Sequence, residues 1–255
     1  MLALRVLISL ALSSTLAFGQ APPAAPAFDV ASVKPSQHPV GPDYNNQFTY
    51  SPSGMTGRNV TLKRVLADAY HLQLNQILGP SWLDRNEYEI DVRAAGVSTR
   101  EQMALMLRSL VAERFKLKQH SEMREMRVYA VEISKSGAKI HAIRDGETVA
   151  AGAEFHFHGD LRQFADLLAV QFSIPASTNP NEPVRASSAQ NLVVDKTGLE
   201  GIFDFSVDIH PELGTDAFTL WQRALESQLG LRIESRKENV AVLVVDDAAK
   251  IPTEN

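Results

Sequence analysis

Hydrophobic residues recur in the same order in two parts of this chain. Residues 100–133 and 214–247 align without a gap at an offset of 114, and their apolar positions fall in register. In the first part these positions keep helical and then strand spacing: Met103, Met106, Leu107, Leu110, Val111, Phe115, Leu117, Val128 and Ala130. The match predicts an internal duplication. Coincidence is the alternative, because units of a helix and a hairpin are common.

The same periodicity predicts how the first half begins. Residues 28–33 alternate and Pro35 ends the run, as in a strand near the edge of a sheet. A second short strand is expected at 47–50. Gly54 and Gly57 are expected to turn the chain into a helix.

Two helices are predicted in this half. The first runs from about Val60 to His71 with Asn59 as its N-cap, and its inward face holds Leu62, Val65, Leu66 and Ala69. The second is opened by Ser98 and Glu101, which have the spacing of a capping box, and ends at about Arg114.

Strands are predicted around these helices. A short one is expected at 74–78 and a half-buried one at 88–92. Beyond the second helix, residues 115–120 and 126–133 are expected to pair as a hairpin across Glu122 to Glu125.

The second half repeats the order. A strand at 155–158 precedes a helix at 161–171, a polar loop at 175–183, and strands at 190–195 and 203–207. Helices that recur between strands and hairpins predict an α+β fold of two tandem helix, strand, helix and hairpin repeats. We expect the helices to cover one face of the sheet, with pseudo-twofold symmetry.

The N-terminal segment predicts export. One positive charge, at Arg5, precedes an apolar stretch that ends in small residues, so cleavage after Gly19 is expected. A membrane anchor is the alternative, but the apolar run is shorter than the roughly 18 residues that a bilayer requires. The chain thus divides into a signal peptide (1–19), a Pro/Ala tether (20–27), a first repeat (28–133), a connector (134–154) and a second repeat (155–255).

Charge and composition exclude several classes of function. The net charge of −5 and the lack of a basic run argue against a nucleic-acid partner. The chain has no cysteine, so disulfides and cysteine nucleophiles are excluded. Ser-x-x-Lys and Gly-x-Ser-x-Gly motifs are also missing from the sequence. We therefore predict no catalytic residue, no cofactor and no bound metal.

Two local patterns suggest chemistry and are better explained by structure. Asp195 to Gly198 spells the tetrapeptide of cation-pumping ATPases, but a turn that follows a strand explains it, with Gly198 at positive φ. His156 and His158 project from one face of a strand, where zinc would need further ligands from Asp160, His210 or Glu212. No pair has the spacing of a zinc motif, so we expect both imidazoles to face solvent.

Several motifs resemble those of a known family. They are residues 28–35 (FDVASVKP), 79–83 (GPSWL) with 88–91, 110–117, 193–201 (VVDKTGLEG) with Phe203, 229–231 and 242–255. Together they resemble a family of uncharacterised exported proteins that is expanded in soil bacteria and is defined by a domain of unknown function.

The resemblance implies a location. Some relatives carry this domain behind a membrane metallopeptidase of the beta-lactam-sensor type, which implies extracytoplasmic sensing or binding. In addition, residues 61–133 are similar in element order to the short N-terminal domain of secretins and TonB-dependent receptors, which engages partners outside the cytoplasm.

These observations predict a non-enzymatic binding module in the cell envelope, periplasmic or extracellular, without a membrane span after signal cleavage. Its partner would be an unidentified envelope protein or peptide, bound at an open sheet edge or in the groove between the halves. The alternative is a hydrolase of envelope or extracellular polymer, with His156, His158, Asp160 and Asp204 in the cleft between the repeats.

Overall fold

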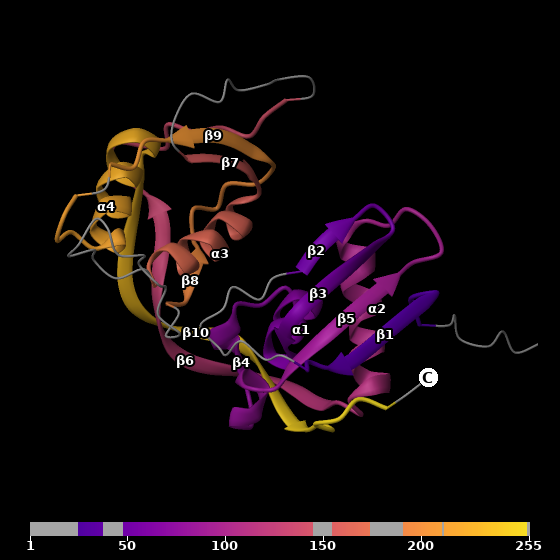
Figure 1. Cartoon of the computed structure of the whole chain (residues 1–255). Coiled ribbons are helices and arrows are strands. Elements are labelled where there is room, and N and C mark those ends of the chain that lie inside the picture. The colour runs from indigo at the N-terminus through magenta and orange to yellow at the C-terminus, as the bar shows by residue number, and fades with distance from the viewer. Residues whose placement is uncertain (1–24, 38–47, 145–154, 174–190, 211, 254–255) are drawn as a thin grey trace, which may run out of the picture.

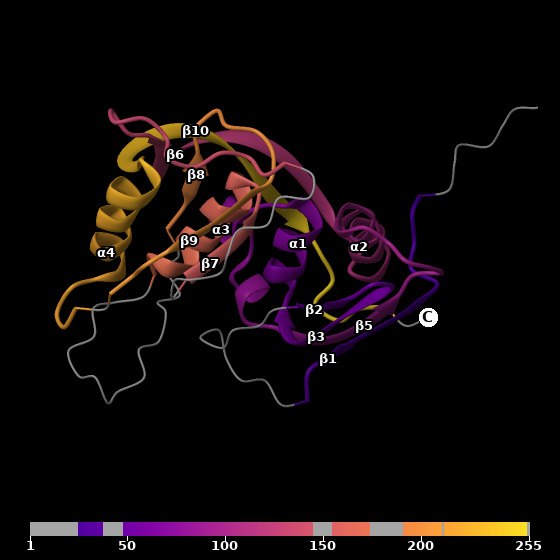
Figure 2. The same ribbon diagram turned by 90° about the horizontal axis from the view of Figure 1, so that it is seen from above.

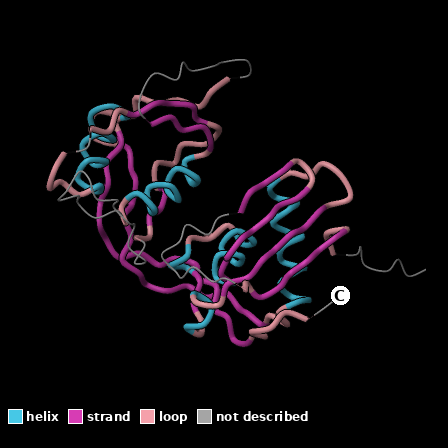
Figure 3. Tube along the Cα trace, viewed as in Figure 1, coloured by secondary structure: helices cyan, strands magenta, loops and turns pink. Residues whose placement is uncertain are grey.

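The protein has two lobes joined by a long two-stranded ribbon (Figures 1 and 3). The computed structural model describes residues 25–37, 48–144, 155–173, 191–210 and 212–253. The predicted signal peptide, most of the tether, the end of the connector and the loop at 175–183 lie outside the described residues. Helices and sheets are both present in each lobe, which confirms the α+β class.

The first lobe is a four-stranded antiparallel sheet with helices on one face (Figure 2). Its strand order is β1-β5-β3-β2, so the first strand does lie at an edge, as predicted. All four predicted inward residues of α1 are fully buried in this core. The elements are β1 (Val30–Pro35), β2 (Phe48–Ser51), β3 (Gly54–Thr61), α1 (Leu62–Tyr70), β5 (Glu87–Arg93) and α2 (Arg100–Arg114).

The prediction of a turn at Gly54 and Gly57 is wrong, because both residues belong to strand β3. A Cβ atom at Gly54 would lie 2.4 Å from the carbonyl oxygen of Val92, and one at Gly57 would lie 2.7 Å from the ring of Phe48. These glycines therefore allow neighbouring backbone and side-chain atoms to pack closely inside the sheet.

Both predicted helix caps of the first lobe are displaced along the chain. Thr61, rather than Asn59, caps α1, and its hydroxyl oxygen accepts a hydrogen bond from the backbone N–H of Arg64 at 3.2 Å. The capping box of α2 consists of Thr99 and Gln102, one residue beyond the predicted pair. In each case a neighbouring polar residue with a side chain suited to capping takes the position.

The second lobe packs two helices and a small sheet around an aromatic core. Helix α3 has the predicted bounds, and the rings of Phe155 and Phe164 form T-shaped contacts with the buried Trp221. The elements are β7 (Phe155–Gly159), α3 (Leu161–Gln171), β8 (Val193–Asp195), β9 (Phe203–Val207), α4 (Ala217–Ala224) and the π-helical turn η3 (Leu225–Leu229).

The ribbon differs from the fold that the sequence predicts. The predicted hairpin at 115–133 does not form. Residues 118–133 are one continuous strand, β6 (Lys118–Ile133), which pairs antiparallel with β10 (Leu231–Asp247). Glu122 is partly exposed, and Arg124 and Glu125 are exposed, in the middle of the ribbon where the strands pass between the lobes. Water can therefore solvate these charges without a turn.

Each long strand contributes to both lobes (Figure 1). Val131 lies in the core of the second lobe, whereas Leu243 and Val245 complete the core of the first. Two short strands extend the ribbon on opposite sides: β4 (Ile77–Leu78) pairs parallel with β10, and β8 pairs parallel with β6. This reciprocal pairing accords with an internal duplication, which stays a prediction, as do its pseudo-twofold symmetry and the repeat boundaries.

Candidate functional site

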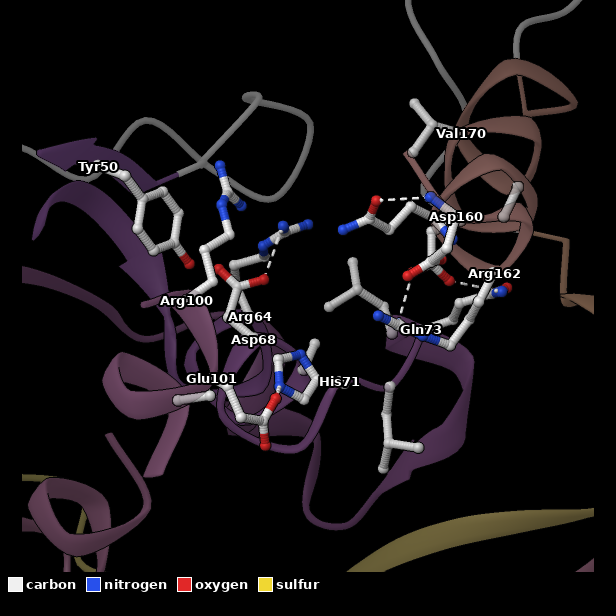
Figure 4. A pocket seen from close by; sticks show the side chains of 17 residues that line it. Tyr50, Arg64, Asp68, His71, Gln73, Arg100, Glu101, Asp160, Arg162 and Val170 are labelled. Carbon is white, nitrogen blue, oxygen red and sulfur yellow. Dashed lines mark hydrogen bonds and ion pairs between the residues drawn. The ribbon is translucent and has the colours of Figure 1, made fainter. Parts of the chain in front are cut away.

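A cleft of about 390 Å³ lies between the two lobes (Figure 4). One wall is built from β2, α1 and the first turn of α2, and the other from α3. The floor is the segment after α1, where η1 (Leu74–Gln76) begins. Most of the lining is polar, which distinguishes this space from the apolar interiors of the lobes.

On the first wall, Arg64 and Asp68 form an ion pair on the outer face of α1. They are four residues apart, and Nη2 of Arg64 donates to Oδ1 of Asp68 at 2.9 Å. Burial raises the pKa of Asp68 above its ordinary value, although Arg64 opposes this shift. Two buried atoms, Nε of Arg64 and Oδ2 of Asp68, have no hydrogen-bond partner among the described residues.

Tyr50 and Arg100 stand beside this pair. The guanidinium carbon of Arg100 lies 4.2 Å from the centre of the Tyr50 ring, a cation–π contact. Burial, together with the negative charge of Asp68, raises the pKa of Tyr50 to about 12. Its hydroxyl group is therefore neutral and can donate a hydrogen bond across the physiological pH range. Further along the wall, Nε2 of His71 lies 2.9 Å from Oε2 of Glu101.

The α3 wall is more acidic. Asp160 caps the helix, accepting a hydrogen bond from the backbone N–H of Gln163 at 2.7 Å. Arg162 pairs with Asp166 at 3.3 Å, one turn along. Burial raises the pKa of Asp166, and the positive charge of Arg162 opposes this shift.

Gln73 fixes the floor by bonding across the two lobes. Its Nε2 donates to the carbonyl oxygen of Val193 at 2.5 Å and to Oδ1 of Asp166 at 2.9 Å, while its Oε1 accepts from the N–H of Val193 at 3.0 Å. The amide group thus pairs with Val193, the first residue of β8, as a backbone peptide would. Because all three bonds cross from one lobe to the other, Gln73 holds the spacing of the walls.

We expect the Gln73→Glu substitution to destabilise the protein by about 2–3 kcal/mol, because it removes both donated bonds and places a carboxylate against Asp166. Combining it with Asp166→Asn supplies a donor and removes the repulsion, so the double variant should regain part of the loss. Urea denaturation of the wild type and the three variants measures both effects. The explanation is contradicted if the double variant loses more stability than the two single variants lose together.

The four residues of the predicted hydrolase site do not come together in the cleft. Only Asp160 lines it. His156 and His158 are on β7, on one exposed face as predicted, and both contact Asp204 of β9, at 2.5 Å and 3.1 Å. Hydrogen bonds from the two imidazoles lower the pKa of the Asp204 carboxyl group.

The described surroundings of the histidine cluster hold neither a metal-binding group nor a nucleophile paired with a base. Within the described ranges, no group of three or more His, Asp or Glu side chains is arranged to hold a metal ion. Ser206 lies opposite His156 in the β7–β9 ladder, but its hydroxyl oxygen is buried and has no hydrogen-bond partner in the part of the chain that the structure describes. Nucleophile and base are therefore not paired at this position.

The Asp195 to Gly198 motif is a turn, as predicted. Oδ1 of Asp195, at the end of β8, accepts hydrogen bonds from the backbone N–H and the hydroxyl group of Thr197, at 2.9 and 2.8 Å. Gly198 has a φ of +69°. This arrangement is an Asx turn that orients the chain after β8 and requires no phosphate chemistry.

The polar walls of the cleft were not found from sequence. Arg64 and Asp68 face away from the core of their lobe, but nothing in the sequence shows that α3 lies opposite. Arg100 and Arg162 belong to no recognisable sequence motif. The spacing of Arg64 and Asp68, four residues apart on an outward face, was the one available signal.

The fold and the cleft define a two-lobed α+β protein with a polar groove between its lobes. Within the described part of the chain, no helix has the length and apolar character needed to cross a membrane. The model of the family "protein of unknown function (DUF3738)" matches residues 63–248, and the chain belongs to this family. This confirms the resemblance to an uncharacterised domain family. Comparison with curated proteins and with solved structures found no match.

Proposed function

We propose that the protein is an exported, non-enzymatic binding module of the cell envelope, which holds its ligand or peptide partner in the cleft between the lobes. The observation that carries the proposal is the cleft itself, whose charged walls come from both lobes and whose floor is bridged by Gln73. Ligand sites commonly lie between domains, where one ligand contacts both sides.

Export is supported by the N-terminal sequence, with its single Arg5, apolar stretch and small residues before Gln20. The resemblance to exported proteins of soil bacteria, some fused to a membrane metallopeptidase, supports the same location. The similarity of residues 61–133 to a domain that engages partners outside the cytoplasm also favours binding over catalysis.

The test is ligand-dependent stabilisation with a blocked cleft as the comparison. Fractions of a cell-envelope extract are added to the purified protein, and the midpoint of thermal unfolding is measured. A bound ligand should raise the midpoint, and the midpoint should keep rising as the ligand concentration increases above the dissociation constant. Val170→Trp should abolish the shift, because Val170 is an exposed residue of the cleft wall, whereas Val97→Trp, at an exposed residue away from the cleft, should retain it.

Absence of stabilisation by every fraction would remove support for the binding role. Mass spectrometry of the same mixtures tests the hydrolase alternative. Products that accumulate with time, and that disappear when His156 and Asp204 are replaced, would favour the enzyme.

A further inference from the structure

Charge is distributed unevenly over the cleft, and one of its cations forms no close ion pair with a residue that the structure describes. Arg64 is paired with Asp68, Arg162 with Asp166, and His71 with Glu101. Arg100 is different. Its guanidinium group is solvent-exposed, contacts the face of Tyr50, and forms no ion pair or hydrogen bond with any residue that the structure describes.

The two arginines of the first wall lie together at this end of the cleft. Arg64 and Arg100 both extend into the space that faces α3 (Figure 4). Nε of Arg64 is buried without a hydrogen-bond partner in the described ranges. Burial raises the pKa of Asp68, so the carboxylate that lies between the two arginines is easier to neutralise than an exposed one.

We propose that this end of the cleft binds an anionic group, a carboxylate or a phosphate, held by the guanidinium of Arg100 with Arg64 beside it. The inference rests on the proposed binding function and names the chemical class of its ligand. Arginine suits this role, because its planar guanidinium presents two parallel donors to the two oxygens of a carboxylate or phosphate. The Tyr50 ring holds the guanidinium in place by stacking, and so reduces the entropy lost on binding.

The α3 wall adds selectivity. Asp160 and Asp166 face the arginines across the cleft, so a ligand with anionic groups at both ends would be repelled from that side. The arrangement favours an anion at the Arg100 end joined to neutral or hydrogen-bond-donating groups that reach α3.

Calorimetric titration of the full chain with acetate and inorganic phosphate tests the proposal and distinguishes the two chemistries. At least one should bind saturably, and neutral acetamide should not bind. We expect Arg100→Gln to weaken the affinity by about tenfold or more, since a charge-assisted bidentate contact is lost. Arg100→Lys should give an intermediate loss of affinity, because lysine keeps the charge but lacks the two parallel donors of the guanidinium group.

Arg127→Gln is the matched control. Arg127 is an exposed arginine of β6 outside the cleft, so its replacement removes the same charge and should leave the affinity unchanged. Unfolding midpoints of the variants confirm that each is folded. The inference is overturned if neither anion binds the wild type at about 10 mM, or if Arg100→Gln binds as tightly as the wild type.

The experiments distinguish failure of the anion site from failure of the binding function. If an envelope fraction stabilises the protein and Val170→Trp blocks it, but Arg100→Gln does not change that stabilisation, the binding module stands and the anion site does not. If no fraction and no anion binds, both proposals fail.

Discussion

Phe164→Ala is expected to lower the free energy of unfolding by about 3–5 kcal/mol, among the largest effects of any single substitution in this chain. The Phe164 side chain is fully buried, and its ring centre lies 4.9 Å from Phe157, 5.0 Å from Phe205 and 6.1 Å from Trp221. Truncation would leave a cavity among these rings, which rigid aromatic neighbours fill poorly.

The two tryptophans make the measurement specific to each lobe. Trp221 belongs to the core of the second lobe, and Trp82 packs against the core of the first. Guanidinium denaturation is followed by fluorescence in Trp82→Phe and Trp221→Phe backgrounds. Because the ribbon is part of both cores, we expect Phe164→Ala to shift both transitions. A shift confined to Trp221 would show that the lobes unfold independently. Val97→Ala, at an exposed position, should change stability by less than about 0.5 kcal/mol.

Gly230→Ala is expected to cost about 3 kcal/mol, for two reasons that a second glycine separates. Gly230 has a φ of +66°, and a Cβ atom there would lie 2.0 Å from the carbonyl oxygen of Gly137. Left-handed backbone alone accounts for about 1 kcal/mol, and displacement of the Gly137 carbonyl for about 2 kcal/mol more.

Gly198→Ala isolates the first contribution. Gly198 has nearly the same φ, +69°, and no described residue outside its own turn lies within 4 Å of where a Cβ atom would stand, so only the backbone conformation is strained. Urea denaturation should therefore give a loss of about 1 kcal/mol for Gly198→Ala. Equal losses at the two glycines would show that the 134–139 segment moves aside without cost, contrary to the hydrogen bond between Lys139 N–H and the Leu229 carbonyl.

Periodicity predicted the elements of this fold well and their pairing poorly. The bounds of α3, the buried faces of α1 and α2, and the alternation of β5 follow from which side chains must leave water, a local property of the sequence. Strand partners are set by distant residues. Nothing in 118–133 shows that its partner is 231–247, and the charged residues at its centre suggested a turn.

The candidate site was beyond prediction for the same reason. Each wall is an outward helix face that is ordinary in isolation, and it becomes part of a cleft only because the ribbon sets the other lobe opposite. Gln73 illustrates the point. Glutamine is a residue type usually found at the surface. Here it forms three hydrogen bonds to residues that lie 93 and 120 positions further along the chain.

The exchange of strand ends between lobes also constrains the order of folding. The core of the first lobe includes Leu243 and Val245, and the hydroxyl group of Tyr88 donates to the carbonyl oxygen of Lys250 at 2.8 Å. A chain emerging from its N-terminus therefore cannot close that core until nearly its last residues are available. Such long-range closure slows folding. A truncation after residue 144 would remove Leu243 and Val245 and leave the apolar core of the first lobe open.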